Sequence, residues 1–452
     1  AEMFKDFKGG KAVASGEAFD PTPANIEARV KRLKTPGGME LVLLPKQNRG
    51  DKVNAIISLF LGNEKDLVNR RIAGMVAAGM LQRGSLKYDR QQIQDEFNKL
   101  KTRFGIGGDA SRSGANLDTT RDNLIPALKL SAEILRNPAF DPKEFEEVRQ
   151  SYIAGFERQL SDPQRLAENV LMKNISSYPK GDFREFLSPA EIIAQLKTLT
   201  LDDVKKFYQD FYGASNAKIA IVGDFDDKAV VPAIEEAFGN WKSKTSFAPI
   251  SEVYYDAPAI NKTIETPDKA NAYFTASMNL KISDSDPDYP ALFIGNSIFG
   301  GGSLNSRLGI RIRQKEGLSY GVSSRIMVDE ISPAANFRAT AIAAPENIAK
   351  LEGFFKEELD RLLKDGITEE ELATAKTGFL QQRKIGRSQD NAVANKLRDY
   401  LLMNRTFSWD ADFEKKISEL TVAQVNAALR KYLNPAKMSI VKAGDFAKVA
   451  QK

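Results

Sequence analysis

The chain has 452 residues, of which 42% are apolar and 28% are charged, and its formal net charge is +5. One hydrophobic core rarely serves so long a chain, so we expect two or more domains. The charges are interspersed, without the basic block of a nucleic-acid binder, and no apolar run reaches the roughly 18 residues of a membrane helix.

Two residue types common in active sites are missing, because the chain contains neither cysteine nor histidine. Without cysteine there is no disulfide, no thiolate nucleophile and no sulfur metal site. Without histidine there is no Ser-His-Asp triad and no usual zinc site. The chemistry that this chain performs alone is therefore narrow.

Residues 1–26 are polar, contain glycine and proline and lack hydrophobic periodicity, so we expect an N-terminal arm or linker. The first residue is alanine, which indicates a removed signal peptide or a piece of a longer chain. Together with the lack of cysteine, this favours a periplasmic location, with a cytoplasmic location as the alternative.

Residues 27–240 are expected to form a first α+β unit. Antiparallel strands are predicted within Val30–Gly62 and further strands within Phe104–Thr119. The small apolar run Asn69–Leu81 predicts a buried helix, and the charged run Asp89–Leu100 a second one. Later helices are predicted from a cap at Asp122, with Leu124, Leu128, Ser131 and Leu135 on one face, and then from Asp141-Pro142 and from Pro163.

A repeat relates the two halves of the chain. Leu199–Asp224 and Leu420–Asp445 each read as a helix that begins at a threonine, then a turn, a short β-run and a final Gly-Asp. The charged helices predicted at 141–153 and 368–380 resemble each other as well. We therefore predict an α+β fold of two repeated units, each an antiparallel sheet flanked by helices, with a linker at 241–258 and a second unit at 259–452.

The second unit begins with predicted strands at Lys262–Thr266 and Ala270–Leu280, followed by a small apolar helix at Leu292–Ile298. Between them, the acidic run that starts at Asp284 has the opening spacing of an EF-hand loop. Tyr289 occupies the position that requires glycine and no glutamate closes the loop, so we interpret the run as a turn that leads into the helix.

The segment 299–324 carries the strongest candidate site. After the glycines 300–302, Ser303 is a predicted helix cap, and Leu304, Leu308 and Ile312 form one apolar stripe. Gly317 is predicted to end the helix, and a strand follows. Arg313 then lies near the helix end and Tyr320 just past the turn, where both could donate to a peptide carbonyl or an oxyanion. The alternative is a solvated arginine and a half-buried core tyrosine.

The pattern Arg313-x6-Tyr320, with Glu316-Gly317-Leu318 inside it, resembles the arginine/tyrosine motif of the pitrilysin-type metallopeptidases, which include insulin-degrading enzyme and mitochondrial processing peptidase. The resemblance extends from about Val30 to about Asp445. It implies two halves of two units each, closed around a chamber. One half holds zinc, and the other supplies the arginine and tyrosine that grip substrate backbone. Arg313 and Tyr320 are thereby implied as catalytic and substrate-binding residues.

In the zinc-bearing halves of this family, H-x-x-E-H lies on a buried helix just before a Lys/Arg-Gly step. Here Arg83-Gly84 remains, but Met75 and Gly79 stand in place of the histidines and Ala78 in place of the glutamate. Glu168 lies where a distal ligand would be sought, and we interpret it as structural, since one carboxylate does not hold zinc. The chain therefore resembles a zinc-less half, with no cofactor of its own and with zinc in a partner.

Three functions follow from this resemblance. The chain is the zinc-less half of a two-part peptidase, inactive alone and joined to a partner carrying H-x-x-E-H, either as a separate chain or within a longer one. Peptide substrate would add as a strand to a sheet edge of that partner. Alternatively, it is a structural or assembly subunit of the same fold with no role in proteolysis. The third possibility is a stand-alone peptide-binding module.

Overall fold

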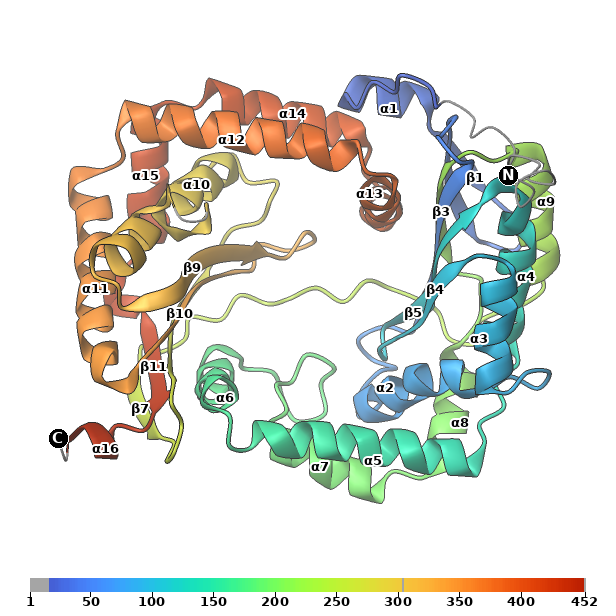
Figure 1. The fold of residues 1–452 in the computed structure, drawn as a ribbon, viewed down its shortest axis with the longest axis horizontal. Coiled ribbons are helices and arrows are strands. Elements are labelled where there is room, and N and C mark those ends of the chain that lie inside the picture. Colours follow the sequence, from blue (N-terminus) through green and yellow to red (C-terminus); the bar gives the residue numbers. More distant parts are fainter. Residues whose placement is uncertain (1–15, 303–304, 451–452) are drawn as a thin grey trace, which may run out of the picture.

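The computed structural model describes residues 16–302 and 305–450, and two β-sheets face each other across it (Figure 1). Most of the predicted N-terminal arm, as well as Ser303 and Leu304, lies outside the described residues. The end of that arm differs from the prediction, because Pro23–Arg29 forms helix α1. Thr22 caps this helix by accepting from the Asn25 backbone N–H, and proline occupies its first position, where it is well tolerated.

The first sheet has the order β1-β2-β6-β3-β5-β4. Its strands are β1 (Lys31–Lys34), β2 (Glu40–Pro45), β3 (Lys52–Phe60), β4 (Arg103–Gly108), β5 (Arg112–Thr120) and β6 (Lys218–Gly223). The antiparallel pairing predicted within 30–62 holds for β1 with β2. Strands β2 and β3 also run in opposite directions, but they are not paired, because β6 lies between them and runs parallel to β2. Short-range patterns do not report a strand that returns from so far along the chain.

The second sheet has the order β7-β11-β8-β10-β9, with β7 and β11 parallel and the other pairs antiparallel. Its strands are β7 (Asn261–Glu265), β8 (Ala272–Leu280), β9 (Ser319–Val328), β10 (Ala335–Ala343) and β11 (Ser439–Gly444). This order repeats that of β2-β6-β3-β5-β4 in the first sheet. The predicted α+β fold of two repeated units is therefore confirmed.

The helices flank the sheets, and many of them begin at a side-chain cap, as α3, α5 and α12 do. The α-helices of the first unit are α2 (Arg71–Met80), α3 (Arg90–Lys99), α4 (Arg121–Arg136), α5 (Pro142–Gln159), α6 (Pro163–Ile175), α7 (Pro189–Thr198), α8 (Leu201–Phe211) and α9 (Asp227–Phe238). Those of the second are α10 (Tyr289–Asn296), α11 (Ile348–Asp365), α12 (Glu369–Arg387), α13 (Asp390–Met403), α14 (Phe407–Glu419), α15 (Val422–Tyr432) and α16 (Ala447–Ala450). Short 3₁₀ turns occur at Leu81–Arg83, Pro345–Asn347 and Pro435–Lys437, and π-helical turns at Ser297–Gly301 and Gly309–Lys315.

The capping residues explain where the two repeated helices begin. One predicted cap is wrong. Thr200 and Thr421 close capping boxes at the starts of α8 and α15, which are the matching helices of the repeat. The predicted cap at Asp122 is wrong, since α4 begins at Arg121 after Thr120. Asp122 lies in the first helical turn, where a carboxylate is favoured by the helix dipole. The acidic run before α10 is a turn, as predicted, and Asp284 pairs with Arg405 at 2.6 Å.

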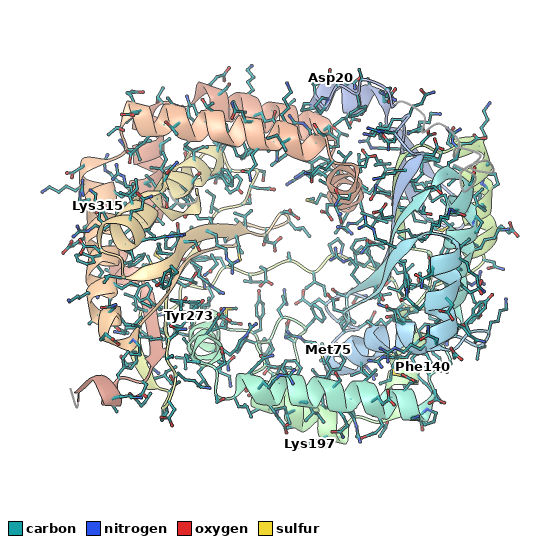
Figure 2. The ribbon with its side chains drawn as sticks, in the orientation of Figure 1. Asp20, Met75, Phe140, Lys197, Tyr273 and Lys315 are labelled. Carbon is teal, nitrogen blue, oxygen red and sulfur yellow. The ribbon has the colours of Figure 1, made fainter. Side chains whose placement is uncertain are left out.

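Two helices are exchanged between the units: each packs on the sheet of the unit to which it does not belong. Helix α6 follows α5 of the first unit but packs on β8 and β11 of the second sheet, while α13 follows α12 and packs on β6 and β3 of the first. Figure 2 shows Tyr273 of β8 beside α6. The two shared cores contain Ala167, Leu171, Ile175, Tyr273, Val441 and Ala443 on one side, and Val42, Ile56, Ala220, Val393, Ala394 and Leu397 on the other.

This exchange covers the second face of each sheet with a helix from the other unit. It explains why β6 is almost entirely buried, as strands covered on both faces are. Each large apolar side chain buried in this way contributes about 1.5–3 kcal/mol to the free energy of folding, so the units stabilise each other.

Residues 241–258 contain no helix or strand, and a long irregular segment crosses between the units (Figure 1). The domain boundaries at 27–240 and 259–452 stay a prediction. No helix within the described ranges has the length and hydropathy that a membrane span requires.

Candidate functional site

Arg313 lies on a π-helical turn, Gly309–Lys315, where an α-helix was predicted. Leu308 and Ile312 are fully buried, as the predicted stripe requires. Gly317 has φ +63°, and the Leu318 N–H donates to the Ile312 carbonyl at 3.0 Å, so this glycine ends the turn as predicted. The buried face fixes the turn against the core and leaves Arg313 exposed on its outer side.

The neighbouring arginines of the same segment are engaged in ion pairs. Arg307 holds Glu371 through two hydrogen bonds of 2.7 and 2.8 Å. Arg311 pairs with Glu316 at 2.8 Å and lies over the Phe354 ring. Among the described residues Arg313 has no such partner, which makes it the guanidinium of this segment that is available to another molecule.

A β-bulge presents Tyr320 to solvent. In the pairing of β9 with β10, Ser319 lies opposite Ala343 and Gly321 opposite Ile342, so Tyr320 is the extra residue. The Ser319 hydroxyl supports the bulge by donating to the Ile342 carbonyl at 2.7 Å and accepting from the Gly321 N–H at 3.1 Å. Tyr320 is 94% exposed, which rules out the alternative of a half-buried core tyrosine. Bulges commonly re-aim a side chain beside a functional site.

Neither Arg313 nor Tyr320 lines any of the five best-defined cavities of the described residues. Both side chains are exposed to solvent. The cleft expected from the sequence and the roles of the two residues stay a prediction.

The degenerate zinc-motif positions lie on α2 and are packed as structure. Val76, Ala77 and Ala78 are buried, and Met75 is half-buried. A Cβ added to Gly79 would lie 2.7 Å from the Tyr152 hydroxyl oxygen of α5. Burial raises the pKa of Tyr152, and its phenol fills the space that a side chain at Gly79 would need. These residues do not fit a zinc ion, and no group of three or more possible ligands occurs where the structure is described.

Glu168 connects the two units instead of facing α2. Its carboxylate accepts hydrogen bonds from Tyr273 of β8 at 3.1 Å, from Gln164 at 3.1 Å and from Arg165 at 3.2 Å. Tyr273 belongs to the second sheet, so this hydrogen bond helps to hold α6 against that sheet. The structural interpretation of Glu168 agrees with these contacts.

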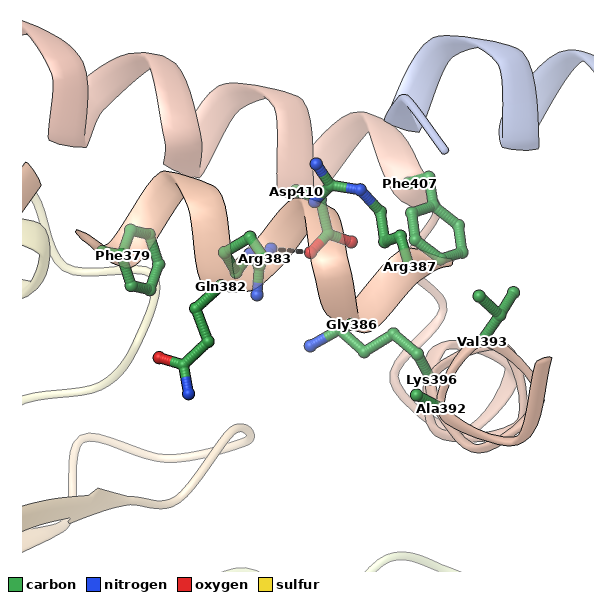
Figure 3. A pocket seen from close by; sticks show the side chains of 10 residues that line it. All are labelled: Phe379, Gln382, Arg383, Gly386, Arg387, Ala392, Val393, Lys396, Phe407 and Asp410. Atoms are coloured by element: carbon green, nitrogen blue, oxygen red, sulfur yellow. Dashed lines mark hydrogen bonds and ion pairs between the residues drawn. The ribbon is translucent and has the colours of Figure 1, made fainter. Parts of the chain in front are cut away.

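Sequence reasoning missed two cavities, because each is assembled from elements far apart in the chain. One, of about 240 Å³, lies among α12, α13 and α14 (Figure 3). Figure 3 shows Arg383 reaching Asp410, while Arg387 pairs with Glu414. These two arginines are therefore paired, whereas Lys396, which also lines the cavity, lies over the Tyr400 ring. The other, of about 540 Å³, lies between the units and is lined by Arg338 of β10. Polar residues alternate in that strand, which was the available signal for a second functional face.

Within the part of the chain that the structure describes, the packed α2 and the lack of a ligand cluster leave no zinc site. Residues 198–379, which include Arg313 and Tyr320, match the family model of the Peptidase M16 inactive domain. Over these residues the chain is similar to the inactive domain of the M16-type peptidases. The resemblance inferred from the sequence is confirmed.

Relatives and solved structures agree with this assignment. The non-peptidase homolog YmxG of Helicobacter pylori is 22% identical over 332 residues, which cover 71% of this chain and 72% of that protein. A crystal structure of a peptidase M16 inactive domain from Pseudomonas fluorescens matches with a TM-score of 0.79 and 28% identity, covering 92% of this chain and 97% of that one. The periplasmic protease PqqL of Escherichia coli shares the fold, with a TM-score of 0.72 and 16% identity. The match covers 96% of this chain but 46% of PqqL.

Proposed function

We propose that this chain is the zinc-less half of a two-part metallopeptidase. It helps to enclose a peptide and supplies Arg313 and Tyr320 to a zinc site carried by its partner. The observation that carries the proposal is the presentation of these two residues. One is an arginine without an ion pair among the described residues, and the other is held outward by a bulge at 94% exposure. A side chain with only a packing role would be buried or paired.

The chemistry divides between the two halves. The partner's zinc would polarise the peptide carbonyl and activate the attacking water. In this chain, the Arg313 guanidinium and the Tyr320 hydroxyl would donate hydrogen bonds to the carbonyl oxygen as negative charge develops there. Ala78 occupies the position of the general base, so this half has no group at α2 to take the water's proton. We therefore expect it to be inactive alone.

The partner would be a homologous half with H-x-x-E-H, as a separate chain in a heterodimer or within one polypeptide. The match to about half of PqqL, which is described as a protease, supports a two-part assembly. The same neighbour is periplasmic, which supports a periplasmic location over a cytoplasmic one. The description of YmxG as a non-peptidase homolog favours the alternative function, a structural or assembly subunit.

Affinity purification of the tagged full chain from its own host tests the proposal. We expect a homologous chain with H-x-x-E-H to co-purify in equal amount, together with zinc that metal analysis assigns to that partner. Recovery of the chain alone, or within a large assembly free of any H-x-x-E-H protein, would contradict the peptidase proposal and support the structural alternative.

A further inference from the structure

The cavity of about 540 Å³ between the two units has the size of a ligand site. Its walls come from the end of α6, from the segment after Ile250 and from the β9–β10 hairpin. Apolar and aromatic side chains, among them Met172, Tyr254 and Met327, alternate with charged ones. Such a lining suits a peptide with at least one charged group.

One buried arginine of this cavity has no ion pair with a carboxylate among the described residues. Arg338, on β10, is 9% exposed, and its Nε has no hydrogen-bond partner. Its Nη2 contacts the Met172 sulfur at 2.8 Å, a weak acceptor. Burial lowers the pKa of Arg338, and the nearby positive charge of Arg325 lowers it further. A desolvated cation without a carboxylate is costly, and buried charges are ordinarily paired.

A second arginine stands directly opposite. Arg325 of β9 and Arg338 of β10 are cross-strand partners, so their side chains project from the same face of the sheet. Like charges in such a pair destabilise the sheet. Arg325 is exposed, and none of the ion pairs among the described residues includes it or Arg338. Two guanidinium groups therefore adjoin each other without a neutralising anion.

The carboxylates of Glu168, Asp329 and Glu252 are engaged elsewhere, and no hydrogen bond joins the Glu330 carboxylate, also in the cavity wall, to Arg338 among the described residues. Glu168, whose charge reaches Arg338, accepts from Tyr273 and Arg165. In the cavity wall, Asp329 accepts from the Glu252 N–H and the Ser332 hydroxyl, and the Glu252 carboxylate accepts from Tyr178. None of them satisfies Arg338 Nε, so the missing acceptor is expected from a ligand.

We propose that Arg338 and Arg325 form a carboxylate-binding site for the peptide held between the two units. This rests on the proposed function, in which the chain encloses a peptide. The planar guanidinium fork matches the two oxygens of a carboxylate, so both groups grip one anion from neighbouring strands. Met172 and Met327 are adaptable apolar contacts for the adjoining peptide. The carboxylate is that of an acidic side chain or of the peptide C-terminus.

Fluorescence anisotropy with the isolated full chain tests this site. Three labelled decapeptides of otherwise equal sequence are compared: one with glutamate and an amidated end, one with glutamine and a free C-terminus, and one with glutamine and an amidated end. We expect a carboxylate peptide to bind roughly 10- to 100-fold more tightly than the neutral one, as charge-assisted hydrogen bonds provide. Whichever carboxylate peptide binds more tightly than the neutral one identifies the source of the carboxylate, either the glutamate side chain or the C-terminus.

Substitutions assign that preference to the pair. Arg338→Met keeps the volume of the side chain and removes the charge, and it should abolish the preference. Arg325→Gln, at an exposed position where folding is not at risk, should reduce it. Equal binding of all three peptides by the wild type, or an unchanged preference in both variants, would overturn the proposal. The assay contains no partner and no zinc, so its failure is distinct from a failure to find an H-x-x-E-H partner.

Thermal unfolding of the free chain separates a ligand site from a structural role. Arg338→Met should raise Tm by a few degrees, about 2–4 °C, because it removes a buried unpaired charge. Arg307→Met is the matched control. It leaves Glu371 without its bidentate partner and should lower Tm. A decrease of Tm in Arg338→Met as large as that in Arg307→Met would show that Arg338 serves the fold, and it would contradict the proposal.

Discussion

Replacing Tyr320 with phenylalanine should lower kcat of the reconstituted peptidase by about 10²-fold, the usual loss for one oxyanion donor. The substitution removes a hydroxyl and no packing, because the side chain is 94% exposed. An interaction formed with the developing oxyanion is stronger in the transition state than in the ground state, so kcat falls more than KM changes. A quenched-fluorescent peptide reports turnover, and gel filtration of the mixed halves reports assembly.

Arg313 should give a parallel result with its own control. Arg313→Ala should lower kcat, and Arg313→Lys should restore it only in part, since the ammonium lacks the planar fork. Arg311→Ala, on the same turn, removes an arginine that is paired with Glu316 and should leave kcat unchanged. If Tyr320→Phe and Arg313→Ala assemble normally and turn over at the wild-type rate, the chain acts as a scaffold.

Replacing Asp410 with alanine should destabilise the protein by about 3 kcal/mol or more, as expected when a buried ion pair loses one member. Asp410 is 2% exposed on α14 and accepts from Arg383 of α12 and from the Tyr400 hydroxyl of α13. Its removal leaves the buried Tyr400 hydroxyl and the partly buried Arg383 guanidinium without this acceptor, and it loosens α13, the helix that covers the first sheet. Arg383 still pairs with Glu414 at 3.0 Å in this variant, so we expect the loss of stability to lie near about 3 kcal/mol and not far above it. Urea unfolding measures the change.

Tyr400→Phe is the matched control for that ion pair. It removes one hydrogen bond and retains the ring, so it should cost about 1 kcal/mol. A free energy of unfolding for Asp410→Ala within 1 kcal/mol of the wild type would show that the contact of α13 with the first sheet does not depend on this pair.

Local sequence patterns predicted the parts of the fold that local interactions determine. The capping boxes at Thr200 and Thr421 start helices from neighbouring residues alone. Gly317 ends the turn after Arg313 because its positive φ suits glycine. The buried helix at α2 followed from small apolar residues. Each of these features depends on only a few consecutive residues.

The features that escaped prediction depend on partners far away in the chain. The insertion of β6 between β2 and β3, and the exchange of α6 and α13, follow from which apolar faces remain uncovered after both sheets form. The bulge at Tyr320 depends on the pairing of β9 with β10 and on the Ser319 hydroxyl. The pairing of Arg325 with Arg338 is a consequence of the same register. Composition and periodicity carry none of this information.

The central claim is that this chain contributes side chains to a zinc site without holding the metal. Its most direct test is zinc content and peptide hydrolysis, measured after dialysis for this chain alone, for its H-x-x-E-H partner alone and for the mixture. We expect zinc in the partner, no stoichiometric zinc in this chain, and efficient hydrolysis only in the mixture. One zinc per molecule of this chain alone, with hydrolysis that a chelator abolishes, would contradict it.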